Sequence, residues 1–164
     1  WYHWRQGIIL KAKPNPGHYA LVEMEKIFPE FLLLTQNVDD LHRKAGSKKM
    51  LELHGNIFRA RCTKCSKEFH HELQPEMPSC ECGELLRPDI VWFGEMIPQE
   101  VWQTSVEFVR CADSVMVVGT SAVVYPAAAI PEIAKQGQAK VIEINIQPGR
   151  SGEILPEIVK TLKN

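Results

Sequence analysis

The sequence predicts an α/β fold in which helices cover both faces of a parallel sheet and a small cysteine-rich unit is inserted. Short continuous apolar runs, such as residues 31–35 and 114–119, are typical of strands buried on both faces. Helical patterns alternate with these runs, and this alternation indicates a parallel sheet with crossover helices. Four of the five cysteines fall between residues 62 and 82, which marks the inserted unit.

The first part of the chain predicts three helices and two strands. A Pro/Gly cluster at residues 13–17 separates the first two helices. Asp39 or Asp40 can cap the third helix, and Gly46 suits its end. The expected helices span residues 1–11, 18–27 and 39–46, and the expected strands span residues 31–35 and 50–54.

The second part begins with the cysteine-bearing residues 57–91, which show little apolar periodicity. Beyond them, helices are expected over residues 98–112, 125–137 and 151–163, and strands over residues 114–119 and 140–146. The predicted domains are therefore a sheet domain of residues 1–56 and 92–164 and a small domain of residues 57–91.

The composition is that of an ordinary globular protein, with 45% hydrophobic residues, 24% charged residues and a net charge of −1. A sequence-independent nucleic-acid binder normally carries a basic surplus, so we expect no direct nucleic-acid partner. No apolar run approaches the length of a membrane span, so we expect no membrane partner. An odd number of cysteines with two close pairs fits a reducing compartment, which favours the cytoplasm.

The cysteine spacing predicts a structural zinc site. Cys62 and Cys65 enclose two residues, and Cys80 and Cys82 enclose one, which is the pattern of a tetrahedral zinc ribbon. Four thiolates close the coordination sphere, so the ion would be structural and one Zn²⁺ is expected. The alternative is four unrelated reduced cysteines. Cys111 stands apart in an apolar helix and is expected to be a small buried residue.

Polar residues follow three of the predicted sheet strands at the point where each strand ends. They are Gln36 and Asn37, then Gly119, Thr120 and Ser121, and finally Asn145. In open α/β sheets the ligand site lies at the carboxyl ends of the strands. The placement therefore predicts a nucleotide site.

Five motifs surround the four cysteines: "TQNVDDLHRKAG", "LELHGN", "LLRPDIVWFGE", "VVGTSAVVYPAA" and "IEIN", in that order. Together they resemble the motifs of the sirtuins, the NAD-dependent protein-lysine deacylases. The resemblance implies a Rossmann-like parallel sheet with a four-cysteine zinc ribbon inserted. It also implies NAD as cofactor, acylated lysine in proteins as substrate, and nicotinamide and 2'-O-acyl-ADP-ribose as products.

The resemblance assigns roles to particular residues of this chain. His54 would be the general base that acts on the nicotinamide ribose hydroxyls, a task that suits a histidine near neutral pH. From the spacing alone, a strand-end histidine that merely caps a turn is the favoured interpretation, and the flanking motifs reverse this preference. The implied cofactor-binding residues are Gln36, Asn37, Asp39, Gly119, Thr120, Ser121, Asn145 and Ser151. The implied substrate-binding segment, to which a peptide would add as a strand, is Val91, Trp92, Phe93 and Gly94.

Tyr2 and Arg5 indicate which acyl groups on lysine the protein would accept. They lie three residues apart and therefore share one helix face. The pair resembles the Tyr-x-x-Arg pair of class III sirtuins, which act on succinyl- and malonyl-lysine. An arginine can hold the terminal carboxylate of such groups through a bidentate contact, and a tyrosine hydroxyl can add a hydrogen bond. From the spacing alone, a surface Tyr and Arg on an amphipathic helix is the favoured interpretation, and the family resemblance shifts it to the functional one.

The sequence departs from the sirtuin pattern in two places. It contains no counterpart of the family's first strand with its glycine-rich loop, and the link from Asn145 to Ser151 is short. The chain is therefore expected to resemble the carboxyl-terminal two-thirds of a sirtuin, and such a fragment can be inactive. Two other functions remain open: a non-catalytic zinc-ribbon binding or regulatory fragment, and a protein ADP-ribosyltransferase on the same fold.

Overall fold

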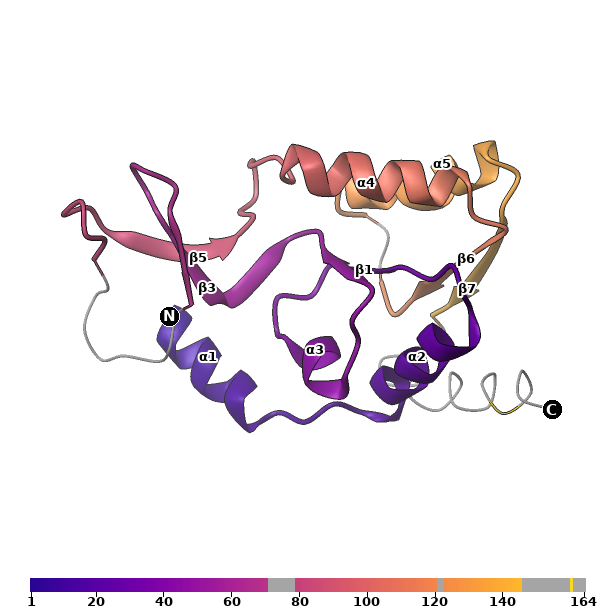
Figure 1. Cartoon of the computed structure of the whole chain (residues 1–164), viewed down its shortest axis with the longest axis horizontal. Coiled ribbons are helices and arrows are strands. Elements are labelled where there is room, and N and C mark those ends of the chain that lie inside the picture. The colour runs from indigo at the N-terminus through magenta and orange to yellow at the C-terminus, as the bar shows by residue number, and fades with distance from the viewer. Residues whose placement is uncertain (71–78, 121–122, 146–159, 161–164) are drawn as a thin grey trace.

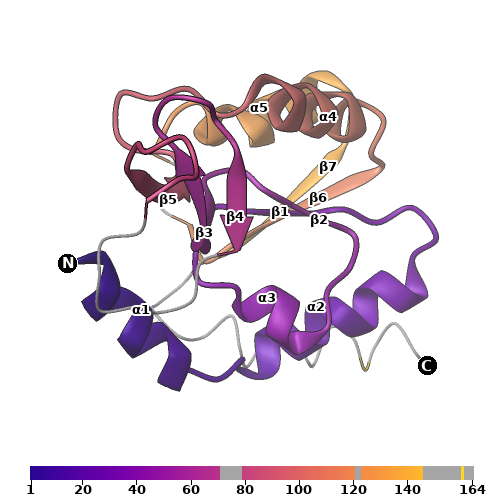
Figure 2. The ribbon, with the colours of Figure 1, turned by 60° about the vertical axis from the view of Figure 1, so that its left-hand side comes forward.

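The computed structural model describes residues 1–70, 79–120, 123–145 and 160, and it arranges them in three layers (Figure 1). The middle layer holds the strands β1 (Leu33–Thr35), β2 (Met50–Glu52), β6 (Ser114–Val118) and β7 (Lys140–Ile144). One outer layer holds α1 (Tyr2–Lys11), α2 (Pro16–Ile27) and α3 (Leu41–Ala45), and the other holds α4 (Gln99–Arg110) and α5 (Ile130–Gln136) (Figures 1 and 2).

The strands of the middle layer pair in parallel, as expected. Leu33 of β1 pairs with Met50 of β2, and Ser114 of β6 pairs with Lys140 of β7. The two pairs are separate within the described residues.

Two apolar clusters cover the strands on opposite faces. On one face, Ala20, Leu21 and Met24 of α2 pack with Ile144 of β7 and with the partly buried Leu33. On the other face, a cluster of α4 and α5 side chains packs against Leu34 and Val115. Because successive strand residues point to opposite faces, Leu33 and Leu34 each reach a different helix layer. This burial on both faces explains the continuous apolar strand sequences.

Helix α2 begins two residues earlier than predicted because Asn15 caps it. The Asn15 side-chain oxygen accepts a hydrogen bond from the His18 backbone N–H at 3.2 Å, and the Asn15 backbone N–H donates to His18 Nδ1 at 3.2 Å. Pro16 occupies the first helical position, where its missing N–H costs nothing. The helix ends before Phe28, which precedes Pro29 and therefore disfavours helical backbone.

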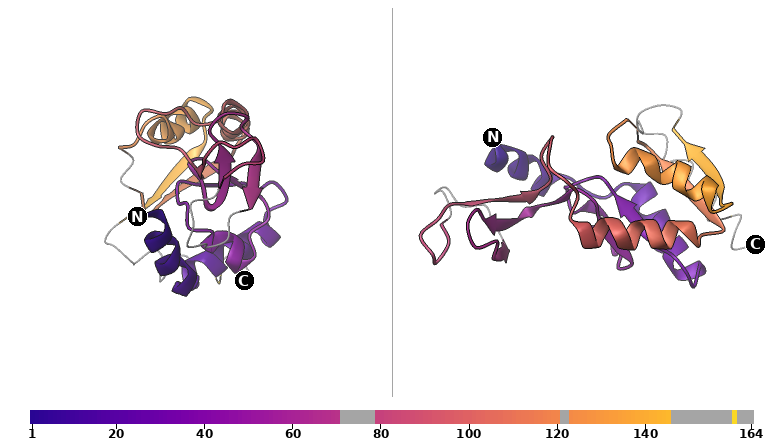
Figure 3. Two further views of the ribbon diagram at one scale, coloured as in Figure 1. Left: turned by 90° about the vertical axis from the view of Figure 1, so that its left-hand side faces the viewer. Right: turned by 90° about the horizontal axis from the view of Figure 1, so that it is seen from above.

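The cysteine-bearing segment forms a second, antiparallel sheet in the order β4-β3-β5. Its strands are β3 (Gly55–Cys62), β4 (Glu68–His70) and β5 (Leu86–Ile90). This sheet lies at the end of the molecule opposite β6 and β7 (Figures 1 and 3). Strand β3 follows β2 after a two-residue turn at Leu53 and His54, so the turn joins the two sheets.

Most predicted elements are present with shifted ends. The predicted helix 125–137 is divided into a 3₁₀ turn at Ala127–Ala129 and helix α5. The expectation of a buried Cys111 is wrong: α4 ends at Arg110, so Cys111 caps the helix and is exposed. Of the predicted final helix 151–163, all but Lys160 lies outside the described residues. None of the described helices is long and apolar enough to cross a membrane.

Candidate active site and cysteine cluster

The four predicted zinc ligands lie together. Their sulfur atoms are all within 4.8 Å of one another, with Cys62 and Cys80 buried and Cys65 and Cys82 exposed. The Cys62–Cys82 and Cys65–Cys80 Sγ distances are 3.5 and 3.7 Å. A tetrahedron of Zn–S bonds of about 2.3 Å requires sulfur separations of about 3.8 Å, so the cluster fits a zinc ion.

The turn around Cys62 favours its thiolate form. The backbone N–H groups of Cys65 and Lys64 point to Cys62 Sγ at 3.5 and 3.4 Å. These hydrogen bonds lower the pKa of the Cys62 thiol to about 6. Because a metal ligand must be deprotonated, the turn prepares the sulfur for binding.

His54 lies in the turn between β2 and β3, and its ring is held by one hydrogen bond. Its Nδ1 atom is 3.1 Å from the backbone carbonyl oxygen of Gln36. A carbonyl oxygen can only accept, so Nδ1 carries the proton in the neutral ring. The Nε2 atom is then left unprotonated, which is the state that a general base requires.

Polar residues at the carboxyl ends of β1, β6 and β7 contact one another. Gln36 Nε2 donates to Thr120 Oγ1 at 3.2 Å, and Asn145 Nδ2 donates to the Thr120 carbonyl at 2.6 Å. Gly119 adopts a left-handed φ of 62° beside them, where glycine avoids strain. Asn37 is fixed by its backbone N–H, which donates to Thr35 Oγ1 at 3.1 Å. Ser121 and Ser151, also predicted for this site, lie outside the described residues.

Asp39 supports the start of α3. Its Oδ1 atom accepts a hydrogen bond from the Leu41 backbone N–H at 3.0 Å. Asp40 follows in a left-handed conformation with φ of 62°, which aspartate tolerates better than most residues. Both aspartates therefore shape the loop between β1 and α3, and the side-chain cap comes from Asp39.

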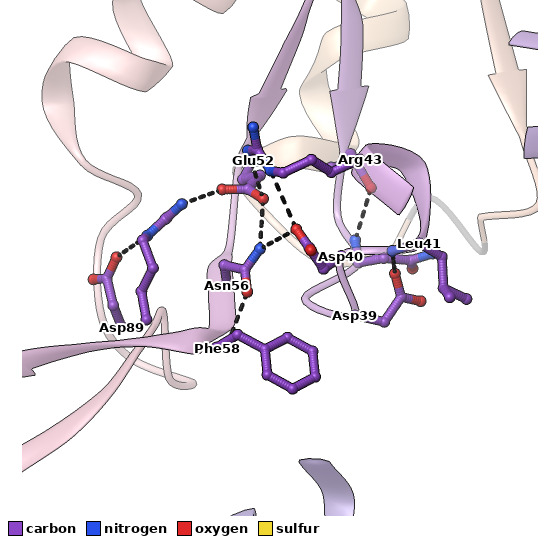
Figure 4. A network of polar contacts seen from close by, with 11 residues as sticks. Asp39, Asp40, Leu41, Arg43, Glu52, Asn56, Phe58 and Asp89 are labelled. Carbon is purple, nitrogen blue, oxygen red and sulfur yellow. Dashed lines mark hydrogen bonds and ion pairs between the residues drawn. The ribbon is translucent and has the colours of Figure 1, made fainter. Parts of the chain in front are cut away.

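A network that sequence reasoning missed surrounds the carboxylate of Glu52, at the end of β2 (Figure 4). Only 8% of the Glu52 side chain is exposed, and Arg43, Asn56 and Arg59 donate to it. Burial raises the pKa of Glu52, but the hydrogen bonds from Asn56 and Arg59 outweigh it and lower the pKa overall. The only sequence signal is the position of Glu52 and Asn56, two residues before and after His54.

The same network connects the segments on either side of His54. Asn56 Nδ2 also donates to Asp40 in the β1–α3 loop at 2.9 Å, and Arg59 also donates to Asp89 of β5 at 3.1 Å (Figure 4). The β1–α3 loop, the His54 turn and the β3–β5 pair are therefore held by one set of hydrogen bonds.

Helix α1 places Tyr2 beside the predicted substrate segment. The Tyr2 ring stacks parallel to that of Trp92, with centroids 6.4 Å apart. Gln6 anchors the helix: it is fully buried, and its Nε2 donates to the Ile57 carbonyl at 2.7 Å. The Arg5 guanidinium lies 5.4 Å from the Trp1 ring centroid, and no carboxylate in the described part of the chain forms an ion pair with it.

The predicted substrate residues follow β5. The Val91 backbone N–H donates to the His54 carbonyl oxygen at 3.0 Å, so the segment begins next to the candidate base. Phe93 is 97% exposed, and Gly94 has a φ of 88°.

The Sir2 family model matches residues 1–126. The chain belongs to the Sir2 family. An NAD-dependent protein deacylase 2 from Pyrobaculum aerophilum is 49% identical over 178 residues, which cover 99% of this chain and 72% of that protein.

Two solved structures of Sir2 proteins share the fold. A Sir2 homologue in complex with NAD has a TM-score of 0.91 and 42% identity, over 99% of this chain and 70% of that one. A Sir2 protein bound to a myristoylated histone peptide has a TM-score of 0.85 and 37% identity, over 99% of this chain and 78% of that one. The Rossmann-like sheet with an inserted four-cysteine unit is therefore confirmed.

Proposed function

We propose that this Sir2-family chain removes acyl groups from lysine side chains of proteins in an NAD-dependent reaction, and that succinyl and malonyl groups are among them. The observation that carries the proposal is the hydrogen bond from His54 Nδ1 to the Gln36 carbonyl, because it leaves Nε2 as a base. Curated relatives named NAD-dependent protein deacylases support the same reaction.

The polar residues at the strand ends suit the ribose and amide groups of NAD. Gln36, Thr120 and Asn145 offer neutral donors and acceptors within one small area. When bound, NAD supplies a ribose carbon from which nicotinamide leaves, and the expected products are nicotinamide, free lysine and 2'-O-acyl-ADP-ribose. His54 Nε2 would take the proton from a ribose hydroxyl, and the Gln36 carbonyl would stabilise the resulting imidazolium through Nδ1–H.

A zinc ion at the four cysteines would have a structural role. It would join the end of β3 to the turn at Cys80 and Cys82 and thereby hold the small sheet together. None of the five cysteines forms a disulfide, which supports our proposal of a cytoplasmic location.

The proposal on acyl preference rests on Tyr2 and Arg5. Gln6 and Trp92 fix the helix that carries both, and Arg5 has no carboxylate partner among the described residues. An arginine in this state can bind the terminal carboxylate of a succinyl or malonyl group, whereas an acetyl group offers no such partner. Acylated lysines of proteins are therefore the proposed substrates.

A panel of acetyl-, malonyl- and succinyl-lysine peptides tests this function. Arg5→Met should lower desuccinylation about 100-fold, the order of a lost charge-assisted contact, and leave deacetylation close to that of the unaltered chain. Lys11→Met removes a positive charge from the same helix and serves as the control. Equal losses on all three peptides would contradict the role of Arg5. A gain of ADP-ribose mass on the protein substrate would favour ADP-ribosyl transfer instead, and no NAD turnover would favour a non-catalytic fragment.

A further inference from the structure

Arg87, in strand β5, contacts both ends of the segment of residues 91–95, which we name the 91–95 loop. Its two terminal nitrogens bind the two carboxylate oxygens of Glu95, with Nη2 and Oε2 at 3.0 Å. The same Nη2 donates to the Ile90 carbonyl at 3.0 Å, just before the loop begins. The guanidinium carbon also lies 3.4 Å from the centroid of the Trp92 ring. One side chain thus holds the loop by three hydrogen bonds, to Glu95 and to Ile90, and by one stacked contact with Trp92.

Glu95 closes the loop from the other side. Its Oε2 accepts a hydrogen bond from the Trp92 backbone N–H at 2.9 Å, and its own N–H donates to the Trp92 carbonyl at 2.9 Å. The turn between them contains Gly94 with a φ of 88°. Arg87, followed by the Trp92 N–H, lowers the pKa of Glu95 to about 2, so Glu95 is a carboxylate throughout the pH range of an enzyme assay.

The 91–95 loop links His54, the proposed base, to Tyr2, which belongs to the proposed acyl contact. At its start, the Val91 N–H bonds to the His54 carbonyl at 3.0 Å. Trp92 stacks with Tyr2, which carries the proposed acyl contact. Phe93 and Met96 are 97% and 89% exposed, so apolar side chains point outward from the closed turn. A rigid loop with outward apolar groups is prepared for a peptide because little ordering is needed on binding.

We propose that Arg87 is a positioning residue that sets the affinity for the acyl-lysine peptide by fixing the 91–95 loop and, through Trp92, the place of Tyr2. This inference rests on the proposed function. Arg87 itself is only 16% exposed at its side chain, so it acts through Trp92 and Glu95. Its planar, two-nitrogen fork suits this role, because a lysine has a single nitrogen and cannot make two parallel hydrogen bonds to the carboxylate while stacking a flat group on the indole.

The experiment compares Arg87→Met, Arg87→Lys and Glu95→Gln with the unaltered chain. Arg110→Met, which removes an exposed arginine at the end of α4, is the control. Fluorescence anisotropy measures the affinity for labelled succinyl-lysine and acetyl-lysine peptides, calorimetry measures the affinity for NAD, and thermal melting reports the fold. We expect Arg87→Met to weaken succinyl-lysine peptide binding about 10- to 100-fold, the scale of a small misplacement in a site.

The expected pattern separates positioning from stability. Acetyl-lysine binding should weaken less than succinyl-lysine binding, because the latter also depends on Tyr2, and NAD affinity should stay unchanged. Arg87→Lys and Glu95→Gln should show intermediate losses. Unchanged peptide affinity in these variants, or parallel losses for peptide and NAD together with a lower melting temperature, would overturn the inference. An unaltered chain that binds no acyl-lysine peptide would instead overturn the proposed function itself.

Discussion

The backbone N–H of Val91 donates a hydrogen bond to the carbonyl oxygen of His54, 3.0 Å away. This contact joins the candidate base to the candidate substrate segment, although the two residues belong to different strand ends. It continues the β3–β5 pairing, in which Gly55 is opposite Ile90. The geometry of this short stretch therefore determines where His54 lies relative to the 91–95 loop.

Gly55 allows the backbones of β3 and β5 to approach each other closely. It has a φ of +78°, and a Cβ atom there would lie 2.0 Å from the Asp89 carbonyl oxygen. We predict that Gly55→Ala lowers the free energy of unfolding by more than about 2 kcal/mol, since it adds left-handed strain and a backbone clash. Urea denaturation measures the loss.

Gly7→Ala is the matched control for that substitution. A Cβ atom at Gly7 meets nothing within 4 Å, and the residue lies inside α1. Alanine is the better helix former, so this variant should gain about 0.5–1 kcal/mol. Equal effects at the two glycines would show that the β3–β5 approach is not as tight as described.

Removal of metal should unfold the small sheet. The ligand set is Cys62 at the end of β3, Cys65 in the turn after it, and Cys80 and Cys82 in a separate turn. An ion would crosslink these segments beyond the strand pairing and the exposed Thr63–Leu85 and Lys67–Glu81 contacts that also join them. Ligation free energy at such sites is on the order of 10 kcal/mol and is gained on folding. Chelation should therefore lower the melting temperature, and Cys65→Ser should do the same without a chelator.

Cys111→Ser provides the control for the cysteine series, because Cys111 is an exposed thiol at the end of α4. Its melting temperature should equal that of the unaltered chain. A zinc-free sample, verified by elemental analysis, that melts at the original temperature would contradict a structural role for the metal.

Loss of the Glu52 carboxylate should loosen the surroundings of His54. Glu52→Gln removes the carboxylate that Arg43 and Arg59 share and leaves each with one other ionic partner, Asp40 and Asp89 respectively. We predict a loss of about 2 kcal/mol in unfolding free energy, because the Glu52 side chain is buried and accepts from both arginines. Glu132→Gln, at an exposed pair with Lys135, should change it by less than about 0.5 kcal/mol. Equal unfolding free energies for the two variants in urea would contradict the importance of the network.

The His18–His42 contact predicts how stability depends on pH. The rings are 4.6 Å apart, and His18 Nε2 and His42 Nδ1 are buried without a hydrogen-bond partner among the described residues. Burial lowers the pKa of His18, and burial followed by repulsion from His18 lowers the pKa of His42, although Asp39 raises both.

The direction in which stability changes with pH follows from proton binding by these two histidines. The unfolded chain protonates these histidines at the ordinary pKa of 6.5, and the folded chain does so only at lower pH. The contribution of these two histidines to stability should therefore be constant well above pH 6.5 and fall below it, by up to about 1.4 kcal/mol per pH unit for each histidine. His42→Gln should flatten the slope between pH 5 and 6.5 relative to a His3→Gln control, and an unchanged slope in urea titrations would refute the assignment.

The features that depend on local sequence could be predicted. The spacing of the cysteine pairs is visible in the sequence and predicts the cluster. Leu33 and Leu34 are adjacent and both apolar, which predicts a strand buried on both faces. Contacts between residues that are distant in the sequence could not be predicted. Gln6 is an ordinary polar helix residue by sequence, yet it is fully buried, and nothing in the sequence pairs Arg87 with Trp92. The prediction for Cys111 failed because α4 ends one residue before it.

The direct test of the central claim is nicotinamide release with an acetyl-lysine peptide and NAD, compared between the unaltered chain and His54→Asn, with mass spectrometry of the products. If His54 Nε2 is the base, the unaltered chain forms 2'-O-acyl-ADP-ribose, and the variant forms it about 100- to 10,000-fold more slowly while its melting temperature stays the same. A folded His54→Asn variant that makes this product at the original rate would contradict the account.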